Sequence, residues 1–233
     1  MWQQFLNLFK HETTGLLKRV PSVKDLYFKE LGLGQYKRES DFKILAPVFI
    51  ENQHRLNVCW AEAWANALAV YYGEQISVRW ITGVAWFRNW CGLNGAQLKV
   101  AGDVVRKRLT NTYGFLTEKE MPSDETLDWD TFKIVDIKGN VAKASPRAIG
   151  SYYFCETPDD IMMALDNGYP TVVGRTWTNK FNPSFILDKD RNSGMGHATL
   201  IVGYFITKIT RTETQGLKDG IITVKDLIKK YAS

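Results

Sequence analysis

Three side chains in this 233-residue sequence have the types and spacing that acyl transfer requires. Cys59 opens an apolar helical stretch, and unpaired backbone N–H groups in the first turn of a helix stabilise a thiolate. Cysteines so placed have pKa values of roughly 3.5 to 7.5, against about 8.5 for a free thiol. Gln53, six residues earlier, can aim a side-chain N–H at the point that the Cys59 backbone N–H reaches, which gives an oxyanion site two donors. The competing interpretation of Cys59 is a buried thiol that packs beside Trp60 and does no chemistry.

The third side chain, His197, begins an apolar strand 138 residues after Cys59. An imidazole within reach of the sulfur would take its proton and later protonate a leaving amine. A histidine at the mouth of a strand is often only a satisfied polar residue. The catalytic alternative requires a fold that brings this imidazole within hydrogen-bond reach of the Cys59 sulfur.

The elements that must position these residues form two groups. A helix over 59–72 has an apolar stripe containing Trp60, Trp64, Leu68 and Tyr71, and it ends at Gly73. Further helices are predicted over 76–90 and 97–109, so the first lobe is mainly helical. Extended runs over 149–154, 171–174 and 197–204 surround one helix over 158–167, so the second lobe is mainly β. The run over 42–49 contains Pro47, which suits an edge strand or a loop.

The first 35 residues read as an appendage. Trp2, Phe5, Leu6 and Phe9 have helical spacing, and a loop follows at Gly32–Gly34. We expect a helix packed on the main domain. The alternative is a segment that docks on a partner protein or a membrane surface.

Composition excludes several classes of protein. A hydrophobic content of 45% supports a full core. The net charge of +5 is spread without a dense basic run, which argues against a nucleic-acid partner. Three cysteines without a C-x-x-C pair and three histidines without H-x-x-x-H spacing predict neither a metal site nor a disulfide scaffold, and no cofactor motif is present. No signal peptide or membrane-spanning stretch is predicted, which favours a protein that is not secreted by the ordinary route.

The segment PVFIENQHRLNVCWA resembles the nucleophile segment of papain-like cysteine peptidases, of the form P-V-x-x-Q-x-x-C-G-S-C-W with variations. Gln53, Cys59 and Trp60 fall in register with it. Residues 196–204, GHATLIVGY, resemble the G-H-A-V-x-x-V-G-Y strand that carries the family's histidine, and residues 114–122 resemble its G-I-x-T-E-x-x-Y-P segment. The resemblance covers roughly residues 41–204 and implies an α+β, papain-like two-lobed fold with the active-site cleft between a helical and a β-rich lobe.

The resemblance also assigns roles and boundaries. It implies that Cys59 is the nucleophile, His197 the base and Gln53 an oxyanion donor, and that Trp60 and the residues matching N-G-G line the substrate groove. Those matching residues are Asn94, Gly95 and Ala96. The expected division is an N-terminal extension over 1–40 and a peptidase domain over 41–233, with a helical lobe over about 59–140 and a β-rich lobe over about 145–225.

Two departures from the family pattern bear on this assignment. Leu56 and Leu93 occupy the positions of a disulfide that family members carry, so we expect an apolar contact between them, as suits a compartment where thiols stay reduced. The family orients its histidine with the asparagine of N-S-W-G, and neither that asparagine nor its tryptophan follows His197 here. Thr210, Thr212 or a backbone carbonyl is left as a weaker orienting group.

Two functions remain open from the sequence. The first is a thiol peptidase that acts on peptide or isopeptide bonds, with bacterial cell-wall peptides among its candidate substrates. The second is a weakly active or inactive papain-fold component of a larger assembly such as a phage virion, with the N-terminal segment as its docking element. The N-terminal segment is too short for the family's usual inhibitory propeptide, so we do not expect activation by propeptide removal.

Overall fold

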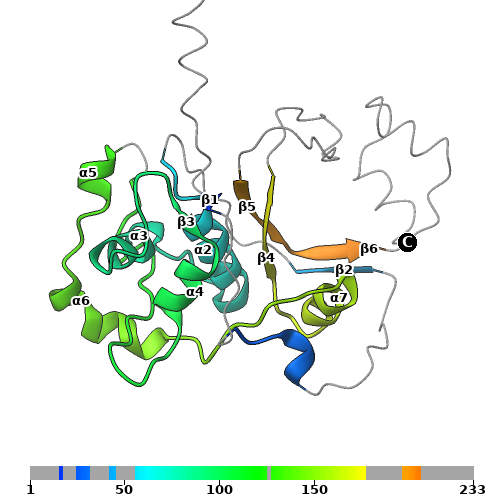
Figure 1. The fold of residues 1–233 in the computed structure, drawn as a ribbon. Coiled ribbons are helices and arrows are strands. Elements are labelled where there is room, and N and C mark those ends of the chain that lie inside the picture. Colours follow the sequence, from blue (N-terminus) through cyan, green and yellow to red (C-terminus); the bar gives the residue numbers. More distant parts are fainter. Residues whose placement is uncertain are drawn as a thin grey trace, which may run out of the picture.

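The computed structural model describes residues 16–17, 25–31, 42–45, 56–124, 127–176 and 196–205. These ranges form two lobes, one mainly helical and one built on antiparallel strands (Figure 1). The α+β two-lobed architecture predicted from the sequence is therefore confirmed. The predicted helix around Trp2–Phe9 lies outside the described residues, and the division at residue 40 stays a prediction.

The helical lobe is organised around one long helix. α2 (Cys59–Tyr72) has the predicted bounds and ends at Gly73, whose φ of 75° is the left-handed conformation that a glycine adopts at low cost. Trp60 and Leu68 are buried in its core, and small buried alanines between them let neighbours approach closely. The other helices of the lobe are α3 (Val78–Phe87), α4 (Lys99–Val105), α5 (Trp129–Phe132), α6 (Ile137–Ala144) and the 3-10 turn η2 (Ser145–Arg147).

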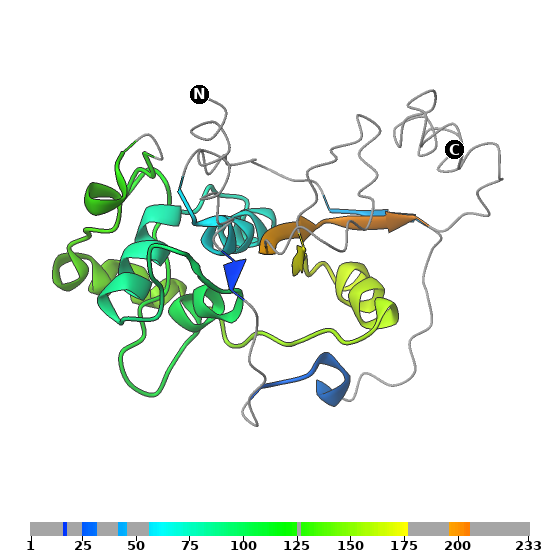
Figure 2. The ribbon, with the colours of Figure 1, turned by 45° about the horizontal axis from the view of Figure 1, so that its top comes forward.

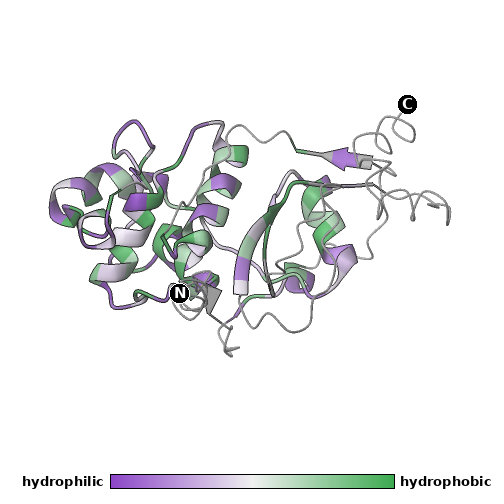
Figure 3. Ribbon diagram, turned by 90° about the horizontal axis from the view of Figure 1, so that it is seen from above, coloured by the Kyte–Doolittle hydropathy of each residue, from purple (hydrophilic) through white to green (hydrophobic). Residues whose placement is uncertain are grey.

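Helix α2 also joins the two lobes. It packs on α3 and α4 on one side and on strands β4 and β5 on the other. Most side chains of α2 are buried, while many hydrophilic positions lie on the outer turns of the helical lobe (Figure 3). The first residue of α2 therefore stands where the lobes meet.

The second lobe consists of paired strands and one helix. β4 (Thr171–Thr176) and β5 (Gly196–Ile201) are antiparallel, with Val173 opposite Thr199, and α7 (Pro158–Asp166) packs beside β4. β2 (Phe42–Ile44) pairs with β6 (Gly203–Phe205) in a separate two-stranded sheet. The predicted run over 197–204 is confirmed as β5 and β6.

Two short strands complete the larger sheet, whose order is β3-β1-β5-β4. β3 is Ala96–Gln97 of the helical lobe, and β1 is Leu16–Leu17 near the start of the chain. β1 runs parallel to β3 and antiparallel to β5, so a piece of the N-terminal segment is a strand between the two lobes (Figure 2).

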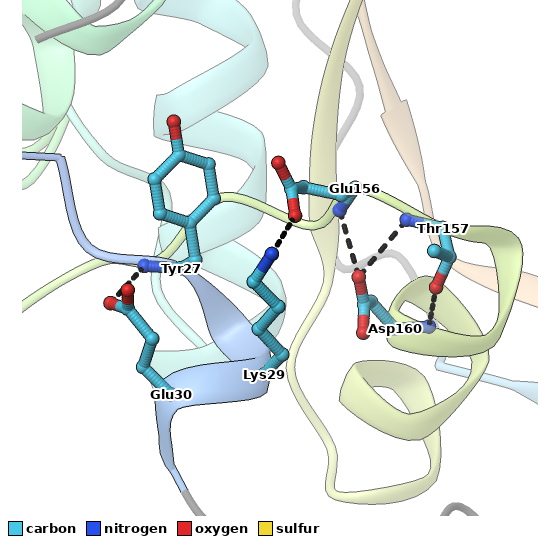
Figure 4. Close-up of polar contacts among 6 residues, drawn as sticks. All are labelled: Tyr27, Lys29, Glu30, Glu156, Thr157 and Asp160. Carbon is cyan, nitrogen blue, oxygen red and sulfur yellow. Dashed lines mark hydrogen bonds and ion pairs between the residues drawn. The ribbon is translucent and has the colours of Figure 1, made fainter.

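A second piece of the N-terminal segment is attached to the β-rich lobe. The 3-10 turn η1 (Phe28–Leu31) follows an exchange in which Phe28 N donates to Phe154 O at 3.0 Å and Phe154 N donates to Leu26 O at 2.8 Å. Lys29 Nζ contacts a Glu156 carboxylate oxygen at 2.5 Å (Figure 4). Because Phe28 is only 6% exposed, this attachment is apolar as well as polar.

Three of the predicted elements differ from the structure. The helix expected over 76–90 starts later, because the Ser77 hydroxyl accepts a hydrogen bond from Trp80 N and so caps α3. The helix expected over 97–109 is shortened to α4. The strand expected over 149–154 is reduced to isolated bridges at its two ends, Ile149 to Arg106 and Phe154 to Tyr27.

Candidate active site

The candidate nucleophile, Cys59, is the first residue of α2 and is only 1% exposed. The helix begins there because Ala61 N and Glu62 N both donate to Val58 O, at 2.8 and 3.0 Å. Cys59 packs with Ala63 of its own helix and with Ala198 of β5 in a small apolar cluster. The sulfur-bearing residue therefore contacts the strand that carries His197.

The surroundings of Cys59 favour the neutral form of its thiol. Burial raises its pKa to about 11, the backbone hydrogen bond of Ala198 opposes the rise, and the negative charge of Glu62 adds to it. The sequence predicted a lowered pKa from the helix N-terminus. The structure differs because the loss of hydration outweighs the stabilisation from backbone groups.

The candidate base, His197, is the second residue of β5 and is half-buried. It lies opposite Arg175 in the β4–β5 ladder and directly precedes Ala198, the residue that contacts Cys59. Residues 59 and 197 thus belong to α2 and β5, and their assignment to the two walls of a cleft stays a prediction. The catalytic pairing of their side chains stays a prediction.

The residues that match N-G-G lie beside the start of α2. Gly92 and Gly95 exchange backbone hydrogen bonds at 3.1 and 2.9 Å, which closes a tight turn that leads into β3. Asn94 is exposed in this turn, whereas Gly95 and Ala96 are buried. The Asn57 amide donates to Leu93 O at 2.9 Å, so this turn is tied to the loop that precedes the nucleophile.

That hydrogen bond also bears on the predicted contact between Leu56 and Leu93. It shows that their two loops are neighbours. Leu56 is buried in the core of the helical lobe, while Leu93 is 61% exposed. The two loops meet as the sequence register requires, and the side-chain contact itself stays a prediction.

Trp60 supports the loop before α2 from inside the core. It is fully buried, and its Nε1 donates to Asn57 O at 3.2 Å. It thereby holds the loop before α2 against the core, and its predicted contact with substrate stays a prediction. Gln53, Thr210 and Thr212 lie outside the described residues.

Strand β1 occupies the place between the two candidate walls of the site. Leu16 pairs with Ala96 on the helical side and with Gly196, the neighbour of His197, on the β side. An extended peptide that used the backbone edges of β3 and β5 would need the same position. The segment that the sequence presented as an appendage is therefore part of the sheet at the candidate site.

Sequence reasoning missed one residue of this site, Glu62. It is a carboxylate only 8% exposed, one helical turn after Cys59, and its charge acts on the thiol. The signal was present as the single acidic residue in the apolar run CWAEAWANALAV. Interior positions seldom carry an acid without a specific reason.

The described residues hold no group of three or more His, Cys, Asp or Glu side chains placed to bind a metal ion. In the same part of the chain, no helix has the length and apolar character needed to cross a bilayer. All three cysteines are described, and none of them forms a disulfide.

Neither a protein-family model nor a curated protein sequence matches this chain. Comparison with solved structures, in contrast, finds similar folds. Xylellain, a cysteine protease from Xylella fastidiosa, is 21% identical with a TM-score of 0.64, over 82% of this chain and 79% of that one. Digestive procathepsin L 3 of the Tenebrio molitor larval midgut is 17% identical with a TM-score of 0.55, over 88% of this chain and 65% of that one. Together with the two lobes and the helix between them, these similarities show that the chain has the papain-like cysteine-protease fold.

Proposed function

We propose that this chain is a cysteine-type peptidase that hydrolyses peptide or isopeptide bonds through Cys59 and His197. The observation that carries the proposal is the contact between Cys59, at the start of the helix shared by both lobes, and Ala198, the neighbour of His197. An arbitrary buried cysteine has no reason to meet a histidine-bearing strand of the opposite lobe. The papain-like fold agrees with this chemistry.

In the proposed reaction His197 takes the proton of the Cys59 thiol as the sulfur attacks the scissile carbonyl carbon. The carbonyl oxygen becomes an oxyanion, which the Cys59 backbone N–H and the Gln53 side chain stabilise. His197 then protonates the leaving amine, so the C–N bond breaks and a thioester remains on Cys59. Water activated by His197 hydrolyses the thioester and restores the thiol.

The need for a free thiol nucleophile also bears on the redox state of the compartment in which the protein works. Because the nucleophile must remain a thiol, and no cysteine of this chain is in a disulfide, we propose that the protein works where thiols stay reduced. Its substrate would be a peptide or protein.

The direct test is hydrolysis of a mixed library of fluorogenic peptides by the purified chain. Cys59→Ala and His197→Ala should each lower kcat/KM by roughly 10⁴-fold or more, since each removes a member of the reacting pair. Cys91→Ala is the matched control, because Cys91 is a half-buried thiol elsewhere in the helical lobe. An epoxide or vinyl-sulfone peptide should label Cys59 alone. Undiminished hydrolysis by the Cys59→Ala variant would exclude the proposal.

One observation favours the second candidate function, a papain-fold binding or structural component. β1 fills the position between β3 and β5, beside the strand whose Ala198 contacts the buried Cys59. A permanently filled cleft would leave the fold without access for substrate. Removal of β1 distinguishes the two candidate functions. A peptidase should then expose a reactive Cys59, whereas a binding or structural component should not.

A further inference from the structure

A basic hollow lies on the helical lobe between the end of α3 and the loop that follows α4. Its volume is about 360 Å³, and cationic side chains dominate its lining. Arg88 comes from the end of α3, and three consecutive cations come from the loop after α4. The complete lining is Arg88, Arg106, Lys107, Arg108, Leu109, Thr110 and Asn111.

Most of this positive charge has no carboxylate partner within the described part of the chain. Arg106 is the exception, since its Nη2 contacts Asp103 at 3.0 Å. A carboxylate oxygen of Asp103 also lies 3.2 Å from Lys99 Nζ, so the charge of Asp103 is already shared and does not neutralise the other cations of the hollow. In the described ranges, Arg88, Lys107 and Arg108 form no ion pair.

The ends of α3 and α4 offset only part of this charge. A helix C-terminus carries about half a negative charge, so two of them compensate roughly one cation. Arg88, Lys107 and Arg108 supply three. About two positive charges therefore remain, which suits a ligand with two negative charges.

The two arginine side chains and the backbone of the loop that carries Lys107 are held in place before any ligand binds. The guanidinium groups of Arg88 and Arg108 lie over the Trp90 ring, at 5.3 and 4.9 Å from its centroid. The Thr112 hydroxyl accepts from Arg108 N and donates to Arg108 O, both at 3.0 Å, which fixes the backbone of the loop. Lys107 N donates to Ile149 O at 2.6 Å. A site fixed in this way loses little entropy when it binds an anion.

We propose that this hollow binds a phosphate-bearing ligand with at least two negative charges. Guanidinium forks match the oxygens of a phosphate group in a bidentate manner, and the Asn111 amide and the Thr110 hydroxyl add neutral donors. The volume exceeds that of a single phosphate and accommodates a pyrophosphate or a phosphate ester. This inference is independent of the proposed peptidase activity, since it uses none of its residues.

Calorimetric titration of the full chain with inorganic pyrophosphate tests the proposal. Lys107→Gln and Arg108→Gln should each weaken binding roughly tenfold, the loss expected for one charge-assisted contact. Lys138→Gln is the matched control, because Lys138 is an exposed cation of the same lobe, in α6. It should change the affinity less than about twofold, as expected for a distant surface charge. Lys107 is exposed and does not stack on Trp90, so its variant tests the site without disturbing the core.

Two further arms identify the source of the phosphate. Binding to vesicles that contain an anionic phospholipid, weakened by Arg108→Gln and not by Lys138→Gln, supports the site with a lipid headgroup as the ligand. No binding of pyrophosphate or vesicles, or equal losses in the control, overturns the proposal and leaves these cations as partners of the helix ends. Binding to long RNA alone also overturns it, in favour of a diffuse basic surface.

Discussion

Removal of strand β1 should open the proposed active site to extended peptides. Two truncations make a matched pair. Deletion of residues 1–14 leaves Leu16 and Leu17 in the chain, and deletion of residues 1–18 removes them. Both variants keep the attachment of η1 to Phe154, because that contact begins at Leu26.

The expected magnitude follows from the pairing of β1. Leu16 pairs with Ala96 and Gly196, and Leu17 pairs with Gln97, which makes three residue pairs. If each pair contributes one backbone hydrogen bond of about 1 kcal/mol net, β1 competes with a peptide by about 3 kcal/mol. Such a free energy corresponds to roughly a 100-fold change in the population of open sites.

The assay compares a peptidyl vinyl sulfone with iodoacetamide as labels of Cys59. The peptidyl probe needs the backbone edges of β3 and β5, whereas iodoacetamide needs only the sulfur. Labelling by the peptidyl probe should rise roughly 100-fold in the 1–18 deletion relative to the 1–14 deletion, by the free energy above, with a smaller change for iodoacetamide. Equal peptidyl labelling in the two variants would refute the reasoning and show that β1 does not compete with peptides.

Three other outcomes test the packing and the electrostatics. Gly114→Ala should destabilise the fold by roughly 2–4 kcal/mol in urea unfolding, because Gly114 has a φ of +62° and a Cβ there would collide with the Ala144 carbonyl oxygen at the end of α6. Gly168→Ala, at a φ of +81° with nothing within 4 Å of the added Cβ, should cost only about 1 kcal/mol. The Arg147 guanidinium lowers the pKa of Glu120 to about 2, so the stabilisation from this pair is complete above pH 4.5 and is lost as the pH falls from 4.5 towards 2. Arg147 is 36% exposed, so screening leaves about 1–2 kcal/mol, and the Glu120→Gln variant should lack this acid-dependent loss. Iodoacetamide labelling of Cys59 in the full chain should rise about tenfold per pH unit towards a pKa of about 11, and a plateau below pH 8 would contradict the buried thiol.

The sequence was most informative where local signals and tertiary packing agree. The bounds of α2 were predictable because its apolar stripe ends at a glycine that adopts φ 75°. α7 was predictable because Thr157 and Asp160 form a capping box around Pro158 at its start. In both helices the predicted end is determined by residues that act within one turn, so no knowledge of the rest of the fold is needed.

Strand pairing was less predictable, because a strand depends on partners that are distant in the sequence. Residues 149–154 have the composition of a strand, yet Ile149 and Phe154 each meet a different single residue, Arg106 and Tyr27. β1 shows the reverse case, since two leucines in a basic segment become a strand only because β3 and β5 leave a gap of one strand between them. Neither outcome follows from local propensity.

The basic hollow also depends on contacts between segments that are distant in the sequence. Along the chain, Arg88 and the run 106–108 are modest signals, and the sequence argued against a dense basic cluster. The fold brings the ends of α3 and α4 together and concentrates their charge around Trp90. Charge density in space is therefore a property of the helix packing and cannot be read from spacing in the sequence.

The thiol of Cys59 shows why a site can be located from sequence while its state cannot. Its position at a helix start is local and predicts stabilisation of a thiolate. Its burial against Ala198 and the buried charge of Glu62 depend on the packing of two lobes, and together they raise the pKa to about 11. At that value only about one sulfur in 10⁴ is ionised at pH 7. The proposed peptidase must therefore rely on His197 to take the proton during attack, or on an opening of the site that hydrates the sulfur. The two truncations distinguish a cleft that opens from one that stays filled.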